Sequence, residues 1–144
     1  RNCLAVLKQQ FEERRIAVAL DIPAALPNVA LDAEQMEQVF FNLVKNALEA
    51  IADGGALAIA IGADDQDVSV TFRDNGLGMD AEQLAHLFEP YRTTKEKGTG
   101  LGLMVSKRIV TDHGGTIAAE SAPGKGTAFT VTLPRLERRV RALK

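Results

Sequence analysis

The sequence predicts one α+β domain, built as a two-layer α/β sandwich in which helices cover one face of a mixed sheet. Segments with alternating apolar residues come in adjacent pairs, which favours antiparallel hairpins. Segments with apolar residues at three- and four-residue spacing lie between these pairs, and a helix does not follow every strand as it would in a strictly parallel sheet. With 144 residues, of which 46% are hydrophobic, the chain is long enough for one buried core.

The first two expected elements come before a pair of prolines, and a long helix follows them. Apolar spacing predicts a short helix over 4–14, and alternation predicts a strand over 16–23. The long helix is expected from Asp32, whose side chain can cap it, to residue 52, because its apolar residues recur every three or four positions. Two glycines at 54–55 end it.

Two hairpins and two further helices complete the expected order of elements. The hairpin strands have alternating apolar residues and are separated by short polar or glycine-containing turns. Asp80 can cap the first of the two helices, and a pair of glycines ends the second. The expected strands cover 56–64, 67–75, 116–123 and 127–134, and the expected helices cover 81–88 and 100–113.

Composition excludes several classes of protein. The net charge of −2 and the pI of about 5.7 leave no basic surface for nucleic acid. Cys3 is the single cysteine, so no intramolecular disulfide and no thiolate metal site can form. No apolar run approaches the length of a membrane span. The first residue is Arg1, and we expect the chain to be a piece of a longer protein.

Three polar side chains lie on one face of the long helix. Gln38, Asn42 and Asn46 are spaced four residues apart, so they stack along the helix. Amide oxygens suit Mg²⁺, which usually keeps several waters and needs few protein ligands when phosphates are present. Asn46 and Asn42 are therefore candidate metal ligands. The alternative is that this face is only the polar side of a half-buried helix.

The block DNGLGM at 74–79 places an aspartate where a strand ends. The Asp74 carboxylate can accept a hydrogen bond from the exocyclic amine of adenine. Gly76 and Gly78 allow positive φ and a close approach of the backbone to the base. Because Asn-Gly is also a common turn pair, the alternative is a plain turn.

A glycine run precedes and opens the helix expected at 100–113, with glycines at 98, 100 and 102. Free amides at a helix N-terminus form an anion site, which favours a phosphate cradle over a flexible hinge. Neither a dinucleotide G-x-G-x-x-G motif nor a G-x-x-x-x-G-K-[ST] phosphate loop is present.

The loop before these glycines has the composition of a lid. Phe88 offers an apolar anchor, and Arg92, Lys95 and Lys97 offer cations that can lie over phosphates. The alternative is a solvated loop. Thr127 begins the last expected strand, where its hydroxyl can support the pocket or simply suit a strand position.

Together, these blocks resemble the catalytic, ATP-binding domain of bacterial sensor histidine kinases, in the gyrase, chaperone, histidine kinase and mismatch-repair ATPase superfamily. The N box is similar to QVFFNLVKNALEA at 38–50, the G1 box to DNGLGM, the F box to FEPY at 88–91, the G2 box to GTGLGL at 98–103, and the closing glycine motif to GKGTAFTVTLP at 124–134. The likeness covers about residues 16–134 of a single domain at 1–144. It implies a Bergerat-type ATP-binding sandwich.

The resemblance also implies roles for individual residues. Asn46 would be the main Mg²⁺ ligand, with Asn42 beside the metal and the phosphates. Lys95 would act with them in catalysis, and Asp74 would contact adenine. The other implied ATP contacts are Gly76, Gly78, Arg92, Thr94, Lys95, Gly98, Thr99, Gly100, Leu101, Gly102, Leu103 and Thr127. Tyr91 and Glu49 depart from the family pattern, where the F box often has Phe and some members have a phosphate-contacting Lys.

One position indicates a kinase rather than a hydrolase. By the resemblance, hydrolytic members have a general-base Glu four residues before the metal-binding Asn, and here that position is Asn42, which cannot take a proton. A histidine, itself a nucleophile, needs no such base. The implied activity is transfer of the ATP γ-phosphoryl group to a histidine on the parent's own dimerisation domain. A clamp or chaperone ATPase and a nucleotide-sensing module are the alternatives.

The same resemblance implies the partners and the location. The acceptor histidine lies on a helical hairpin with a His-Glu or His-Asp motif, which this sequence lacks. His86 and His113 lie in expected helices and are interpreted as structural. We expect the isolated domain to be monomeric and to reach a downstream response regulator through its parent. We expect a cytoplasmic domain, whose parent can be anchored to the inner membrane.

Overall fold

Strand pairing builds one mixed sheet in the part of the chain that the structure describes. The computed structural model describes residues 9, 11–22, 32–88 and 102–135. Its sheet has the strand order β1-β2-β3-β5-β4. The strands are β1 (Ala17–Asp21), β2 (Ala56–Ala63), β3 (Asp67–Asp74), β4 (Thr116–Ser121) and β5 (Thr127–Pro134), and the helices are α2 (Ala33–Ala50), α3 (Ala81–Ala85) and α4 (Gly102–Asp112).

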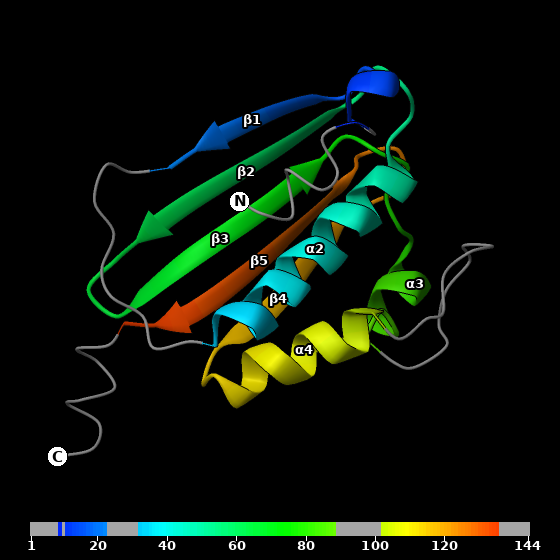
Figure 1. The fold of residues 1–144 in the computed structure, drawn as a ribbon. Coiled ribbons are helices and arrows are strands. Elements are labelled where there is room, and N and C mark those ends of the chain that lie inside the picture. Colours follow the sequence, from blue (N-terminus) through cyan, green and yellow to red (C-terminus); the bar gives the residue numbers. More distant parts are fainter. Residues whose placement is uncertain (1–8, 10, 23–31, 89–101, 136–144) are drawn as a thin grey trace, which may run out of the picture.

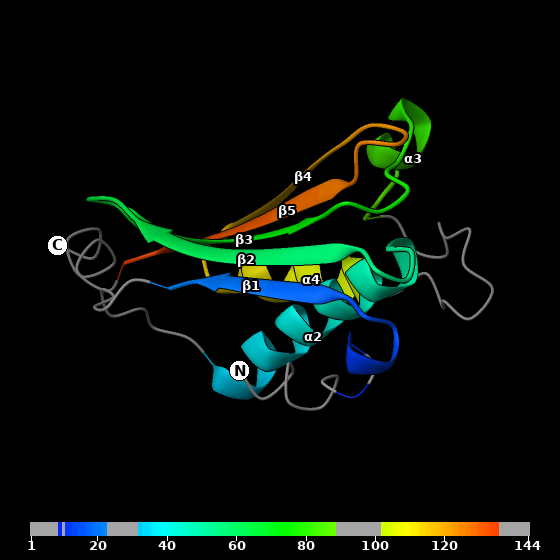
Figure 2. The ribbon, with the colours of Figure 1, turned by 90° about the horizontal axis from the view of Figure 1, so that it is seen from above.

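The helices α2 and α4 lie on one face of this sheet (Figures 1 and 2). Helix α2 connects β1 to β2, which pair in parallel, as a crossover connection requires. The other pairs, β2 with β3, β3 with β5 and β4 with β5, are antiparallel. The predicted α+β class, a mixed sheet covered on one face by helices, is therefore confirmed.

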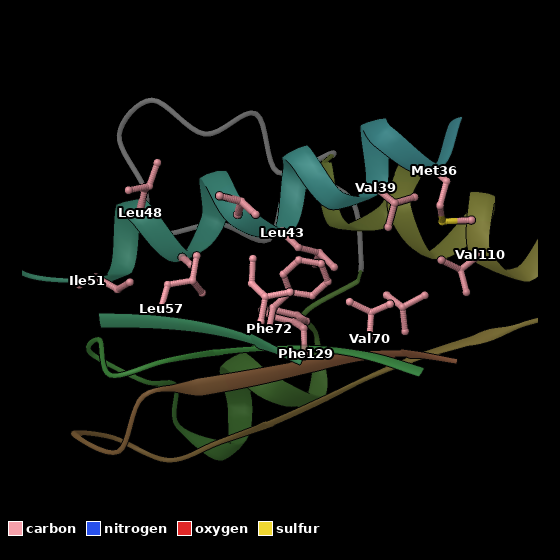
Figure 3. Close-up of a cluster of buried hydrophobic side chains, with 14 of the residues drawn as sticks. Met36, Val39, Leu43, Leu48, Ile51, Leu57, Val70, Phe72, Val110 and Phe129 are labelled. Carbon is pink, nitrogen blue, oxygen red and sulfur yellow. The ribbon is translucent and has the colours of Figure 1, made fainter. Parts of the chain in front are cut away.

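Helix α2 forms the centre of the core. Its N-cap, Asp32, accepts a hydrogen bond from the Gln35 amide at 3.1 Å, as predicted. Its apolar stripe faces the strands (Figure 3), and Val39, Leu43 and Val44 have no exposed surface. The strand residues of this buried layer include Leu57, Val70, Phe72 and Phe129.

Alternation along the strands gives the sheet an apolar inner face and an outer face of small and polar residues. Inner positions are branched or aromatic and belong to the core, among them Leu57, Ile59, Val70, Phe72, Phe129 and Val131. The positions between them point to the outer face and include Ala58, Ala60, Thr71, Ala118 and Thr130. Since only the inner face has large apolar side chains, the helices pack there.

Element ends differ from the predictions by a few residues. Strand β1 is shorter than the 16–23 predicted. Helix α3 ends at Ala85 instead of 88, because the His86 amide bonds to the Leu84 carbonyl as well as to that of Glu82, which begins a tight turn.

Other predicted boundaries agree where the structure describes them. Asp80 caps α3, and Gln83 completes the cap from its side chain. Of the helix predicted over 4–14, the described residues 9 and 11–13 are helical. The start of the helix predicted at 100 lies outside the described residues, and α4 begins at Gly102. None of the described helices is both long and apolar enough to cross a membrane.

We expect Leu43→Ala to lower the free energy of unfolding by about 2–5 kcal/mol, because it opens a cavity under the centre of α2. Lys45→Ala, two residues away on the exposed side of the same helix, should change it by less than about 0.5 kcal/mol. Urea denaturation followed by circular dichroism measures both. Equal effects would contradict the assignment of Leu43 to the core.

Candidate active site

A row of polar side chains ends the apolar inner face of the sheet. The β3–β5 register pairs Asp74 with Thr127, and the β4–β5 register pairs Thr127 with Ser121. The row before it is apolar and contains Phe72, Phe129 and Ala119. Polar side chains therefore enter this face at one row, where the strands reach their connecting loops.

Asp74 is the buried carboxylate of this row, with 5% of its surface exposed. It is the last residue of β3, as predicted. Its Oδ1 accepts hydrogen bonds from the amides of Gly76 at 2.9 Å and Thr127 at 3.2 Å. Two backbone donors on one oxygen hold the carboxylate in one orientation before any ligand binds.

Ser121 is a member of this row that the sequence reasoning missed. Its Oγ accepts a hydrogen bond from the Met79 amide and donates one to the Gly126 carbonyl, both at 2.8 Å, and it lies 2.9 Å from Thr127 Oγ1. Since the Ser121 proton goes to Gly126, the Thr127 hydroxyl donates in the third bond. The alternation along 116–121 places Ser121 on the inner face and would have identified it.

Two glycines hold the DNGLGM loop, residues 74–79, close to its neighbours. Gly78 has a φ of +73°, and a Cβ there would lie 2.0 Å from the Ala122 carbonyl oxygen. A Cβ at Gly76 would lie 2.4 Å from the carbonyl oxygen of Ala50, at the end of α2. The predicted positive φ is confirmed at Gly78 and is wrong at Gly76, where the nearness of α2 excludes a side chain.

The predicted metal ligands lie on one side of α2, between two contacts with other elements. Asn42, Asn46 and Ala50 are spaced four apart. Asn42 Nδ2 donates to Ser106 Oγ on α4 at 3.2 Å, and Ser106 is fully buried. The Ala50 carbonyl accepts from the Leu77 amide at 3.1 Å. Half-buried Asn46 therefore lies between the contact with α4 and the contact with the DNGLGM loop.

The start of α4 and the anchor of the lid are the remaining predicted features within the described residues. Gly102 begins α4, and Leu103 packs partly buried against the core. Phe88, the predicted apolar anchor, packs on the same core, and Lys107 Nζ lies 5.2 Å from the centre of its ring. Outside the described residues lie Arg92, Thr94, Lys95, Lys97, Gly98, Thr99, Gly100 and Leu101.

A hollow of roughly 580 Å³ lies on the outer face of the sheet. Ala58 and Ala128 contribute small side chains to it, and Arg73, Glu120 and Lys125 line it with charge. These are outer-face positions of the strands and the adjoining turn. Asp74, Ser121 and Thr127 also line it, so the hollow reaches the row of polar side chains at the end of the sheet and adjoins the predicted site.

The sequence of this chain matches the family described as histidine kinase-, DNA gyrase B- and HSP90-like ATPase over residues 31–137. It is 44% identical over 135 residues to sporulation kinase E of Bacillus subtilis (strain 168), a match that covers 93% of this chain and 18% of that protein. The chain therefore belongs to this ATPase family, and it spans less than a fifth of the length of that relative.

Similarity to solved structures indicates which type of protein within this ATPase family the chain is. The catalytic domain of histidine kinase ThkA matches with a TM-score of 0.84 at 29% identity, over 94% of this chain and 90% of that one. Full-length ShkA in complex with AMPPNP matches with a TM-score of 0.83 at 25% identity, over 94% of this chain and 29% of that one. The structure of ThkA in complex with response regulator TrrA matches with a TM-score of 0.80 at 26% identity, over 94% of this chain and 39% of that one. Within its family, the chain is a catalytic domain of the sensor histidine kinase type.

We expect Gly78→Ala to be much more damaging than Gly124→Ala. Both glycines have nearly the same φ, +73° and +74°, but a Cβ at Gly124 meets nothing within 4 Å. Backbone strain alone should cost Gly124→Ala about 1 kcal/mol. Collision with the Ala122 carbonyl should raise the loss in Gly78→Ala to about 3 kcal/mol or more. Thermal and urea unfolding measure this difference, and equal losses would mean that the DNGLGM loop is not held by close backbone contact.

Proposed function

We propose that this domain binds ATP with Mg²⁺ and transfers the γ-phosphoryl group of ATP to a histidine on the dimerisation domain of its parent protein. The observation that best supports this is the buried, oriented Asp74 carboxylate at the end of the inner face, next to the helix that bears Asn46. The complex of ShkA with AMPPNP supports the choice of nucleotide.

Asp74 would select adenine by a hydrogen bond. The Gly76 and Thr127 amides orient its carboxylate, which would accept from the exocyclic amine of the base. Guanine presents a carbonyl oxygen at that position, which a carboxylate repels. A hydrogen bond to a charged group is worth about 1.5–3 kcal/mol, so the site would favour ATP over GTP.

The amide oxygens of α2 would complete the shell of a metal held mainly by phosphates and water. Asn42 Nδ2 is engaged with Ser106, so any contact of this side chain with the metal falls to its Oδ1. Asn46 is one helical turn further on and would be the main protein ligand. Bound Mg²⁺ would neutralise charge on the phosphate oxygens. Arg92, Lys95 and the glycine run at 98–102 would add contacts to the phosphates.

The nature of Asn42 favours transfer to histidine over hydrolysis. An amide cannot take a proton from water, and the Asn42 amide nitrogen already donates to Ser106. A histidine nucleophile has its own lone pair and needs no base at this position. The site would therefore work by positioning and charge stabilisation, as other phosphoryl transfers do.

A response regulator would be the downstream partner of the parent protein. The complex of ThkA with TrrA shows a kinase with this fold in contact with such a regulator and supports this proposal. Both ATP and response regulators are cytoplasmic, so the domain would act on the cytoplasmic side.

We expect two substitutions to separate the base contact from the metal contact. Asp74→Asn keeps an acceptor for the two backbone amides but turns a donor toward adenine, so ADP binding should be lost with and without Mg²⁺. Asn46→Ala should weaken only the Mg²⁺-dependent part of the affinity for ADP, by about tenfold. Gln38→Ala, on the same side of α2 but exposed, is the matched control and should change neither. Calorimetric titration gives these affinities; an unchanged affinity in Asp74→Asn would exclude the adenine contact.

The class of enzyme is tested by hydrolysis and transfer. Because the site lacks a base at Asn42 and the chain lacks the acceptor hairpin, we expect this domain alone to bind ATP, barely hydrolyse it and not label itself. Addition of the parent's helical hairpin at high concentration should yield acid-labile, base-stable phosphohistidine. Rapid steady-state hydrolysis by the domain alone would favour a clamp or chaperone ATPase. Binding without transfer to the hairpin would favour a nucleotide-sensing module.

A further inference from the structure

His113 joins the end of α4 to the beginning of α2. Its ring Nδ1 lies 2.8 Å from the Ile109 carbonyl oxygen, and its Nε2 lies 2.9 Å from the Asp32 backbone nitrogen. A carbonyl oxygen only accepts and a backbone amide only donates, so Nδ1 bears the proton and Nε2 accepts. The imidazole ring therefore links His113 to Asp32, which lies 81 positions away in the sequence.

Both ends of this link belong to hydrogen-bonded helix termini. The Asp32 carboxylate caps α2, and its carbonyl accepts from the Met36 amide at 2.9 Å. His113 directly follows α4, and its own amide donates to the Ile109 and Val110 carbonyls, both at 3.1 Å. The ring thus connects the end of one helix directly to the beginning of another.

A second polar contact joins the same two helices, from Asn42 Nδ2 to Ser106 Oγ at 3.2 Å. The helices also bury apolar side chains on the sheet, which Figure 3 shows for Met36, Val39 and Val110. Apolar packing has little directionality and tolerates sliding. Two directional hydrogen bonds at separate points define how far along α2 the helix α4 lies.

The order of these contacts shows that the helices are antiparallel. His113, at the end of α4, meets Asp32 at the start of α2, and Ser106 meets Asn42 further along. Continuing four residues from Ser106 toward the start of α4 leads to Gly102, in the direction in which α2 continues from Asn42 to Asn46. A shift of α4 along α2 would therefore change the separation of its first turn from Asn46.

We propose that His113 is a positioning residue, which sets the place of α4 along α2 and thereby places the phosphate-binding start of α4 relative to Asn46. The inference rests on the function proposed above. His113 acts from the far end of α4, about 16 Å from Gly102 at 1.5 Å per residue. A misplacement of about 1 Å can cost about a hundredfold in rate, so a remote link of this kind has functional weight.

Substitutions of His113 distinguish a link between helices from a contribution to stability. His113→Gln can present an acceptor to the Asp32 amide at a length close to that of Nε2. His113→Asn can still donate near Ile109 but is too short to reach Asp32. Val68→Ala is the stability control, because Val68 is buried on β3 outside the main core cluster. Ser106→Ala removes the second polar contact.

The measurement compares affinities for Mg·AMPPNP and for adenosine in this chain, by calorimetry and by NMR titration. His113→Asn should lose about tenfold or more in affinity for Mg·AMPPNP and change by less than about twofold for adenosine, because only the phosphates meet α4. His113→Gln should recover most of this loss. Ser106→Ala should show the same selective loss and keeps the test decisive if His113→Asn does not fold. Val68→Ala should change neither affinity.

Four results would overturn the proposal. An affinity for Mg·AMPPNP that is unchanged in His113→Asn and Ser106→Ala would exclude a positioning role. A loss of affinity of similar size for Mg·AMPPNP and for adenosine would also exclude it. So would a loss in Val68→Ala equal to that in His113→Asn, since either result would assign His113 to stability alone. Absence of Mg·AMPPNP binding by the unsubstituted chain would overturn the proposed function together with this inference, whereas normal binding by every variant would overturn this inference only.

Discussion

The rotation of α2 on the sheet is the constraint on which the candidate site depends. Successive residues of a helix are about 100° apart, so the direction of Asn42 follows from that of its neighbour Leu43. Leu43 and Val44 are fully buried, and turning α2 to point Asn42 or Asn46 elsewhere would expose them at a cost of about 1.5–3 kcal/mol each. Apolar packing thus determines where two amides point, although it takes no part in their chemistry.

Strand register is the second constraint, and it acts on Asp74. A slip of one residue between β3 and β5 would move Asp74 to the outer face, away from α2 and α4. The same slip would expose Val70 and Phe72, which are buried under α2. The position of the carboxylate is therefore stabilised by the apolar residues that precede it on the same strand.

Local patterns predicted the elements, because caps, alternation and helical spacing act over a few residues. Asp32 and Asp80 cap their helices, and Asp74 ends its strand, as their neighbours in the sequence indicated. Contacts between distant segments could not be predicted in this way. The sequence near Gly76 does not show that Ala50 lies against it, and the sequence near His113 does not show Asp32.

The row of polar side chains differs both from the predicted elements and from the contacts between distant segments, because it departs from the local alternation of apolar residues. Alternation on β3, β4 and β5 calls for apolar residues at Asp74, Ser121 and Thr127, as at the neighbouring inner positions of each strand. Burying polar groups there is costly unless each finds partners. Backbone groups of the DNGLGM loop and the β4–β5 turn supply them, from Gly76 and Met79 on one side and residues 126–127 on the other. The bonds that make the polar row tolerable are thus the same bonds that hold two loops beside the carboxylate. A single apolar replacement would remove both the ligand contact proposed for Asp74 and the attachment of its surroundings. The departure from the binary pattern therefore supports the proposal that this end of the sheet is functional.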